Sequence, residues 1–252
     1  MSSSAIEGPE YFLIEETYTG KHDFFYNSLD FPGIKVLESN WQIIRDEIGK
    51  LISSEEEIDV KNLNPPYLSS PDAWKNLYFY NFGWKKHKNC ERYPKTHALL
   101  KSVPNLVFGG ITVLEPKSKV LPHNGETNTT IRCHLGLKIP APYPVCGVRV
   151  GTEEQGWEEG RVMMFSDAHY HTTWNDSNER RFVLVFDIVR DEFANQKHMV
   201  CAKVLGALSL KMFYSKRPGL KKMPMPVIQA VHFAFSTFWY LYLPVQNRFK
   251  LP

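Results

Sequence analysis

The stretch LPHNGETNTTIRCHLGL, residues 121–137, decides how the rest of the sequence is interpreted. Its second half opens the run IRCHLGLKI (131–139), in which an apolar residue occupies every second position. Because successive side chains of a strand point to opposite faces, the apolar residues share one face. Arg132 and His134 share the other. We therefore expect a strand with one core face and a second face whose cation and imidazole suit an anionic ligand.

Four further runs of β-branched, aliphatic or aromatic residues have the length of strands, and turn-rich segments such as PAPYP and NDSNE separate them. Several short strands at this spacing predict an all-β sandwich or barrel with flanking helices. The five runs are LVFGGITVL (106–114), IRCHLGLKI (131–139), CGVRV (146–150), RVMMF (161–165) and RFVLVFDIV (181–189).

The segments around these strands differ from them in pattern. Residues 40–52 have the apolar periodicity of a helix, a second short helix is expected after Pro94, and residues 74–84 are expected to be extended. The proline-rich stretch 62–72 is expected to be a loop. We divide the chain into an N-terminal helical and irregular segment (1–104), a β core (105–190) and a C-terminal helical, basic and aromatic region (191–252).

Composition excludes several classes of protein. The net charge is only +3, and no run of lysine or arginine resembles a nucleic-acid-binding arm, so nucleic acid is not an expected partner. The four cysteines have no CxxC spacing, which argues against a disulfide framework and a structural zinc site. The polar start MSSSAIEGPEYF has no apolar signal-peptide core. A cytoplasmic location is the expectation.

One segment complicates that expectation. Residues 227–243, VIQAVHFAFSTFWYLYL, are mostly apolar and aromatic, and basic residues flank them. Three interpretations are open: a buried or dimer-forming helix, an element lying on an anionic membrane surface, and a membrane span. The run is short for a span, which requires ~20 apolar residues. We therefore expect a core element, an interface element or peripheral membrane contact, and the oligomeric state is left open.

Two histidines stand at the ends of expected strands. His123 precedes the turn at Asn124-Gly125, and His171 follows the run at 161–165. Imidazole binds iron, copper, zinc or nickel, so the pair predicts a metal site. His169 would share a face with His171 in an extended segment and is a rival ligand by periodicity alone.

Arg181 opens the nearly apolar run at 181–189. A guanidinium is costly to bury unless an anion pairs with it. Either Arg181 and its neighbour Arg180 are solvated charges at the end of a strand, or Arg181 binds an anionic ligand inside the fold.

These segments together resemble the aspartyl/asparaginyl β-hydroxylase family of Fe(II)- and 2-oxoglutarate-dependent oxygenases. The resemblance covers roughly 105–190, and its markers are PHNGETN, IRCHLGL, WEEG (157–160), FSD and HTTW within 165–174, and RFVLVFDI. The upstream text FPGIKVLESNWQIIRDEI is similar to that of bacterial lipid A 2-hydroxylases, which share the domain. The resemblance implies a double-stranded β-helix, a jelly-roll or cupin-like barrel, with the metal at its mouth.

For the metal, the resemblance implies that His123 and His171 bind Fe(II), where O2 would react. Many oxygenases of this kind add a carboxylate two residues after the first histidine, and here that residue is Gly125. Peptide-hydroxylating members of the family also have glycine there, whereas lipid-hydroxylating members have aspartate. At this position the chain resembles the peptide-hydroxylating branch.

For the co-substrate, the resemblance assigns Arg181 and Thr112 to the far carboxylate of 2-oxoglutarate. It assigns Arg132 and His134 to the opposite end. Peptide-hydroxylating members carry a further arginine for the substrate carboxylate, and this chain has Thr130 at that position.

Three hypotheses about function follow. The first is a hydroxylase of the β-carbon of an Asp- or Asn-like residue, in a peptide or a small amino-acid derivative. The second is a hydroxylase of a lipid acyl chain, which Thr130 and the segment 227–243 favour. The third is a non-catalytic, cupin-like module that binds a ligand or partner.

Overall fold

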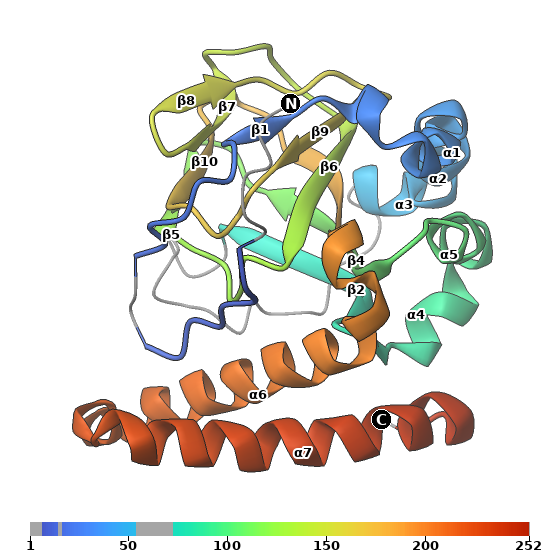
Figure 1. Cartoon of the computed structure of the whole chain (residues 1–252). Helices are drawn as coiled ribbons and strands as arrows, with labels where there is room; N and C mark the ends of the chain where they lie inside the picture. Colours follow the sequence, from blue (N-terminus) through green and yellow to red (C-terminus); the bar gives the residue numbers. More distant parts are fainter. Residues whose placement is uncertain (1–6, 15–16, 54–72, 252) are drawn as a thin grey trace.

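The structure is a computed structural model, and it describes residues 7–14, 17–53 and 73–251. The expected loop at 62–72 lies outside the described residues. Two antiparallel sheets form the centre of the molecule (Figure 1). The larger contains, in spatial order, β1 (Phe25–Tyr26), β9 (Val162–Phe165), β6 (Thr130–Lys138), β11 (Arg181–Val189), β4 (Leu106–Leu114), β2 (Trp74–Asn81) and β3 (Trp84–Lys85). The smaller contains β5 (Ser118–His123), β10 (His171–Asn175), β7 (Cys146–Val150) and β8 (Glu153–Gln155).

The inner faces of the two sheets enclose an apolar core. Val148 and Val150 of the smaller sheet belong to the same buried cluster as Phe165, Val183 and Val185 of the larger one. Alternation along each strand places these side chains inside. The expected jelly-roll, cupin-like architecture is therefore confirmed, and all five strand runs expected from the sequence are strands.

The outer face of the larger sheet is covered by helices. They are α1 (Lys35–Ser39), α2 (Trp41–Glu47), α3 (Gly49–Ile52), α4 (His87–Arg92) and α5 (Pro94–Lys101). Leu37, Ile44 and Leu100 bury their side chains against this sheet. The helix expected at 40–52 is divided at Ile48, and the Glu47 carboxylate accepts hydrogen bonds from the first backbone N–H groups of α5. This capping joins the helices α1–α3 to the pair α4 and α5.

The sheet also uses segments that precede the core expected at 105–190. Strand β2 pairs with β4, and β1 pairs with β9, so residues before 104 complete both edges of the larger sheet. Short 3-10 helices connect the elements: Ser28–Asp30, Pro32–Ile34, Asp191–Gln196 and Pro218–Lys222. The four cysteines are buried free thiols.

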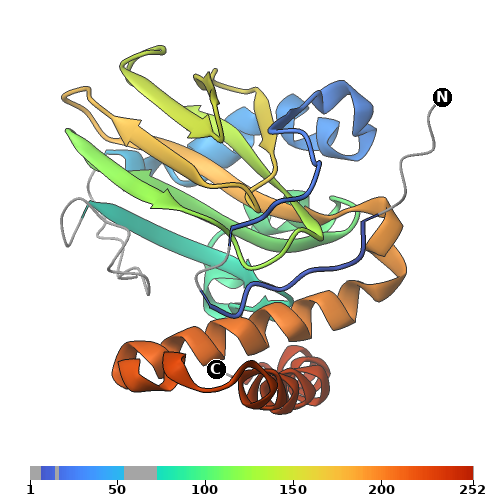
Figure 2. The same cartoon turned by 60° about the vertical axis from the view of Figure 1, so that its left-hand side comes forward.

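The chain ends in a helical hairpin of α6 (Lys197–Lys216) and α7 (Met225–Phe249), which lies below the barrel in Figures 1 and 2. Pro244 lies inside α7 and has no N–H to donate to the carbonyl of Tyr240. The His198 side chain of α6 donates to that carbonyl instead, at 2.9 Å. Among the described residues, neither α7 nor any other helix combines the length and apolar character that crossing a bilayer requires.

Candidate active site

The two histidines singled out in the sequence face each other. His123 is the last residue of β5, His171 is the first of β10, and the two are paired directly across the smaller sheet. Their ring centroids are 4.3 Å apart. Two residues that are 48 positions apart in the sequence are thus brought together by one strand pairing, which the sequence could suggest but not fix.

Backbone carbonyls orient both imidazoles. Nδ1 of His123 donates to the carbonyl of Leu121 at 2.8 Å, and Nδ1 of His171 donates to that of His169 at 3.0 Å. Since Nδ1 carries the proton, the lone pair lies on Nε2, the nitrogen that can bind a metal. Burial lowers the pKa of His123 to about 4 and that of His171 well below its usual value. Both rings are therefore neutral at pH 7, as metal binding requires.

The rival ligand His169 is directed elsewhere. Its Nε2 donates to the carbonyl of His22 at 2.8 Å, and its ring packs edge-on against Phe24 and Tyr18. The expectation from periodicity fails here because β10 begins only at His171, so residues 169 and 171 do not share one regular strand.

A carboxyl group stands beside the glycine that replaces the usual ligand. A Cβ on Gly125 would lie 2.4 Å from Oδ2 of Asp167, and the backbone N–H of Gly125 donates to the Asp167 carbonyl at 2.7 Å. Asp167 is 3% exposed, and its Oδ1 has no hydrogen-bond partner among the described residues. Burial raises its pKa to about 7. The Asp167 side chain therefore fills the space that a side chain at position 125 would need.

Within the described residues, no three His, Cys, Asp or Glu side chains gather as a set that could hold a metal. The donors available for a metal are therefore the two imidazoles, and the Asp167 carboxyl lies beside Gly125 and Arg132. Sequence reasoning missed Asp167. The available signal was its place in the FSD triplet, four residues before His171, in a chain that lacks the carboxylate at position 125.

Arg181 is buried inside the barrel without an anion. It is 2% exposed, and its Nε and Nη1 atoms have no hydrogen-bond partner among the described residues. Its guanidinium carbon lies 4.5 Å from the ring centroid of Trp157. Desolvation lowers its pKa to about 10. The interpretation of Arg181 as a solvated strand-end charge is therefore wrong.

Thr112 lies on the same face of the larger sheet. Val183 pairs with Thr112 and Arg181 pairs with Leu114, so Thr112 is a diagonal neighbour of the arginine across β4 and β11. Its hydroxyl is buried and also lacks a partner within the described part of the chain. A buried cation and a buried hydroxyl, both unsatisfied, form a cradle that an anion with oxygen acceptors would complete.

His134 lies on the same face of the larger sheet, paired with Val185 of β11. The indole N–H of Trp157 donates to its Nδ1 at 3.2 Å. Burial lowers the pKa of His134 well below its usual value, so the ring is neutral and its proton lies on Nε2. The Phe165 ring packs against both His134, at 5.0 Å, and His171, at 5.5 Å. Phe165 thus contacts both His134 and one member of the histidine pair.

Arg132 is held by two carboxylates. Its Nε and Nη2 donate to Asp187 at 2.9 and 2.8 Å, and Nη2 also lies 3.1 Å from Oδ2 of Asp167. These charges raise the pKa of Arg132 above its already high value. The guanidinium is positioned by Asp187 and connects, through Asp167, to the turn at Gly125, which follows His123.

Comparison with known proteins shows which family the chain belongs to. A family model described as aspartyl/asparaginyl beta-hydroxylase matches residues 38–191. This chain belongs to the aspartyl/asparaginyl β-hydroxylase family. An ornithine lipid ester-linked acyl 2-hydroxylase from Rhizobium tropici is 30% identical over 66% of this chain and 60% of its own length. Aspartyl/asparaginyl beta-hydroxylases from Mus musculus and Homo sapiens are each 33% identical over 65% of this chain, but over 22% of their own.

This β-hydroxylase family member thus spans less than two thirds of the length of those relatives. Among solved structures, a Pseudomonas putida prolyl-4-hydroxylase is similar with a TM-score of 0.39 and 13% identity, over 60% of this chain and 87% of that one. A viral collagen prolyl hydroxylase gives a TM-score of 0.36 and 12% identity, over 57% of this chain and 90% of that one.

In this member of the family, the register places all four predicted co-substrate residues on the inner face of the larger sheet. They are Thr112, Arg132, His134 and Arg181. Thr130 is the first residue of β6, the strand that carries Arg132, and its side chain is buried and uncharged.

Proposed function

We propose that this chain is a hydroxylase that binds Fe(II) through His123 and His171 and uses 2-oxoglutarate and O2 to hydroxylate an unactivated C–H bond. The observation that carries the proposal is the buried Arg181 guanidinium, which has no anionic partner among the described residues. A folded protein retains such a charge only against a large desolvation penalty. A dicarboxylate that enters the barrel would remove that penalty.

The residues of the site suit the metal. Two neutral imidazoles with Nε2 lone pairs, oriented by backbone carbonyls, are ligands that iron accepts. When bound, Fe(II) and 2-oxoglutarate supply the oxidising power that places one oxygen atom of O2 in the C–H bond and the other in succinate, with release of carbon dioxide. The protein contributes binding, orientation and exclusion of water.

Arg181 and Thr112 bind the far carboxylate in this proposal. The guanidinium offers Nε–H and Nη1–H, and the threonine offers one hydroxyl. Charge-assisted hydrogen bonds in a site that excludes water are stronger than the same bonds at a surface. Both side chains extend from rigid strands in the centre of the sheet, so the co-substrate is held in one orientation.

His134 and Arg132 bind the other end. Trp157 fixes the His134 tautomer, so Nε2–H is the donor that His134 can offer to an oxygen atom. Arg132 uses Nε and Nη2 for its carboxylates, which leaves Nη1 as the atom for a ligand. Asp167 keeps Arg132 and the Gly125 turn in contact, so co-substrate binding and metal binding share one hydrogen-bonded unit.

The substrate that we propose is the β-carbon of an Asp- or Asn-like residue in a peptide or small amino-acid derivative. Support comes from Gly125, whose surroundings leave no room for a third ligand, as in the peptide-hydroxylating branch of the family. The mammalian relatives that bear this activity in their names are 33% identical. A second candidate is a lipid acyl chain. It is favoured by Thr130, which provides no guanidinium for a substrate carboxylate, and by similarity to the Rhizobium lipid hydroxylase.

Succinate formation tests the chemistry. Purified protein with Fe(II) and 2-oxoglutarate should release succinate slowly without substrate, and His171→Ala should abolish the release. If the iron-loaded protein forms no succinate with any substrate tested, the non-catalytic module becomes the better interpretation. Mass spectrometry then separates the two substrate classes. The added oxygen atom should appear on peptides containing Asp or Asn. Its appearance on acyl chains would make the lipid the preferred substrate class instead.

A further inference from the structure

The outward face of α7 exposes a continuous apolar surface. Eleven of the seventeen large hydrophobic side chains that are exposed in the described part of the chain lie between residues 199 and 249. Five of those on α7 fall within about 80° of one another around the helix axis, at 100° per residue, and Phe233 flanks them, so together they form one apolar band along the helix. We call this the α7 stripe, and its members are Val227 (43% exposed), Phe233 (73%), Phe238 (54%), Leu241 (66%), Val245 (43%) and Phe249 (65%).

The opposite face of α7 is already occupied. Trp239 donates to Ser209 of α6 at 2.9 Å, and the His232 ring donates to the Lys203 carbonyl at 2.9 Å. Leu243 is buried against the α6 residue Val204 in the same apolar cluster. The α7 stripe is therefore not the packing face of a displaced helix, because the hairpin has already formed its internal contacts.

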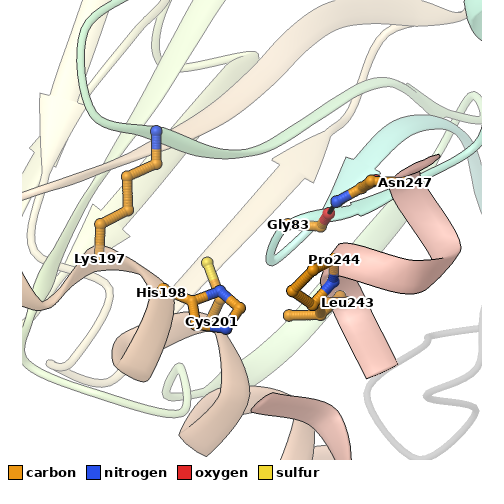
Figure 3. A pocket seen from close by; sticks show the side chains of 7 residues that line it. All are labelled: Gly83, Lys197, His198, Cys201, Leu243, Pro244 and Asn247. Carbon is orange, nitrogen blue, oxygen red and sulfur yellow. Dashed lines mark hydrogen bonds between the residues drawn. The ribbon is translucent and has the colours of Figure 1, made fainter. Parts of the chain in front are cut away.

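The far end of α7 is fixed to the barrel as well. Asn247 donates to the carbonyl of Gly83 at 3.0 Å, beside a cavity between α6, α7 and the turn before β3 (Figure 3). The Gln246 side chain also bonds both backbone groups of Lys85. In Figures 1 and 2 the hairpin lies at the edge of the molecule, away from the smaller sheet. A partner of the α7 stripe would therefore meet a rigid, preformed surface.

The charge of this region is one-sided. Residues 197–252 contain nine lysines and arginines and no aspartate or glutamate, whereas residues 1–196 contain 21 basic and 27 acidic residues. Four exposed basic residues precede α7, and two more lie at its C-terminal end, one in the last turn and one at the C-cap. The first group is Lys216, Arg217, Lys221 and Lys222, and the second is Arg248 and Lys250. No charged residue lies between Lys222 and Arg248.

We propose that the α7 stripe binds the surface of an anionic lipid bilayer, with α7 lying in the plane of the membrane. The helix is about 37 Å long at 1.5 Å per residue, so its two basic groups would contact headgroups at well-separated points. The aromatic and aliphatic side chains between them would enter the boundary between headgroups and acyl chains. Lysine and arginine next to such a helix attract anionic lipids, and residues 197–252 contain no carboxylate side chain to oppose that attraction. The nearest carboxylate to the second basic group is Glu91, which pairs with Lys250 at 2.6 Å and leaves the group before α7 as the main attraction.

The same charges disfavour a second copy as the occupant. Two α7 stripes packed face to face would bring two hairpins with nine positive charges each into contact, and like charges oppose association. A bilayer that contains acidic phospholipid supplies the missing negative charge. The inference does not depend on the proposed catalysis, because none of the residues of the barrel site lies in the α7 stripe.

Vesicle flotation tests the proposal. The full chain should float with vesicles of phosphatidylcholine plus phosphatidylglycerol and remain behind with phosphatidylcholine alone, and added salt should weaken the binding. The triple variant Phe233→Ser, Phe238→Ser, Leu241→Ser should lose more than about tenfold in affinity, since the apolar stripe is removed. Replacing Lys216, Arg217, Lys221 and Lys222 with glutamine should cause a loss of at least about tenfold.

Leu29→Ser is the matched control. Leu29 is 74% exposed, similar to Leu241, but lies on a 3-10 helix far along the chain from the hairpin, so its loss should leave vesicle binding unchanged. Thermal unfolding confirms that each variant is folded. Equal binding of the triple variant and the parent chain overturns the proposal, and so does a failure of the parent chain to bind acidic vesicles. Light scattering that shows a dimer for the parent chain and a monomer for the triple variant, without vesicle binding, identifies a second copy as the occupant instead.

Discussion

Replacing Arg181 with methionine should stabilise the ligand-free protein and remove its response to 2-oxoglutarate. Most substitutions of a fully buried side chain destabilise a fold. Arg181 differs because its charge has no anionic partner among the described residues, while its aliphatic part packs inside the barrel. Methionine retains an unbranched apolar side chain and removes the charge.

The structure gives the magnitude. Desolvation lowers the pKa of Arg181 from 12.5 to about 10, and each pKa unit corresponds to 1.36 kcal/mol, so the buried charge costs about 3 kcal/mol. The variant loses the contact between the guanidinium and the Trp157 ring, which contributes about 1 kcal/mol. We expect a net gain of about 2 kcal/mol in the free energy of unfolding without ligand.

Urea unfolding with and without 2-oxoglutarate measures both effects, with Mn(II) as a redox-inactive metal in all samples. At a ligand concentration a hundred times its Kd, the parent protein should gain about 2.7 kcal/mol, and Arg181→Met should gain almost nothing. Arg180→Met is the matched control, because Arg180 is the preceding residue and its charge is already paired with Glu115 at 2.9 Å in a partly exposed ion pair. That variant should keep the full response to 2-oxoglutarate.

Two results would refute the reasoning. One is a loss of more than about 1 kcal/mol in ligand-free Arg181→Met, which would show that the guanidinium stabilises the empty barrel. The other is equal stabilisation of this variant and the parent protein by 2-oxoglutarate, which would place the co-substrate elsewhere.

Three other changes probe the rest of the site. His171→Ala should weaken Mn(II) binding by calorimetry on the order of a hundredfold, and unchanged affinity would exclude the histidine pair. The folded pKa of His123 is about 4, below its ordinary 6.5, so its contribution to stability is present above pH 6.5 and lost as the pH falls towards 4. His123→Gln should therefore reduce the dependence of the free energy of unfolding on pH in this range by about one proton. An unaltered slope contradicts the assignment. Trp157→Phe removes the donor to His134 and should raise the KM for 2-oxoglutarate by about tenfold at similar kcat, whereas a fall in kcat alone would point to another role.

The sequence by itself predicted much of the barrel. Strict alternation in 131–139 and the apolar run 181–189 predict the central strands, because a strand that forms part of a core must direct every second side chain into it. The same alternation placed Arg132 and His134 on one face, and the register of β6 confirms that arrangement. Local pattern was sufficient here because strand period and burial are both local properties of the chain.

The tertiary structure decided what depends on contacts between distant residues. The Asp167 carboxyl beside Gly125, the isolation of Arg181 within the barrel and the hydrogen bond that directs His169 away all depend on partners that no local pattern identifies. For α7, hydropathy reported the apolar character of 227–243 but not which side of the helix faces α6. Packing alone separates the buried face from the exposed one, since burial is a property of the assembled fold and not of the segment.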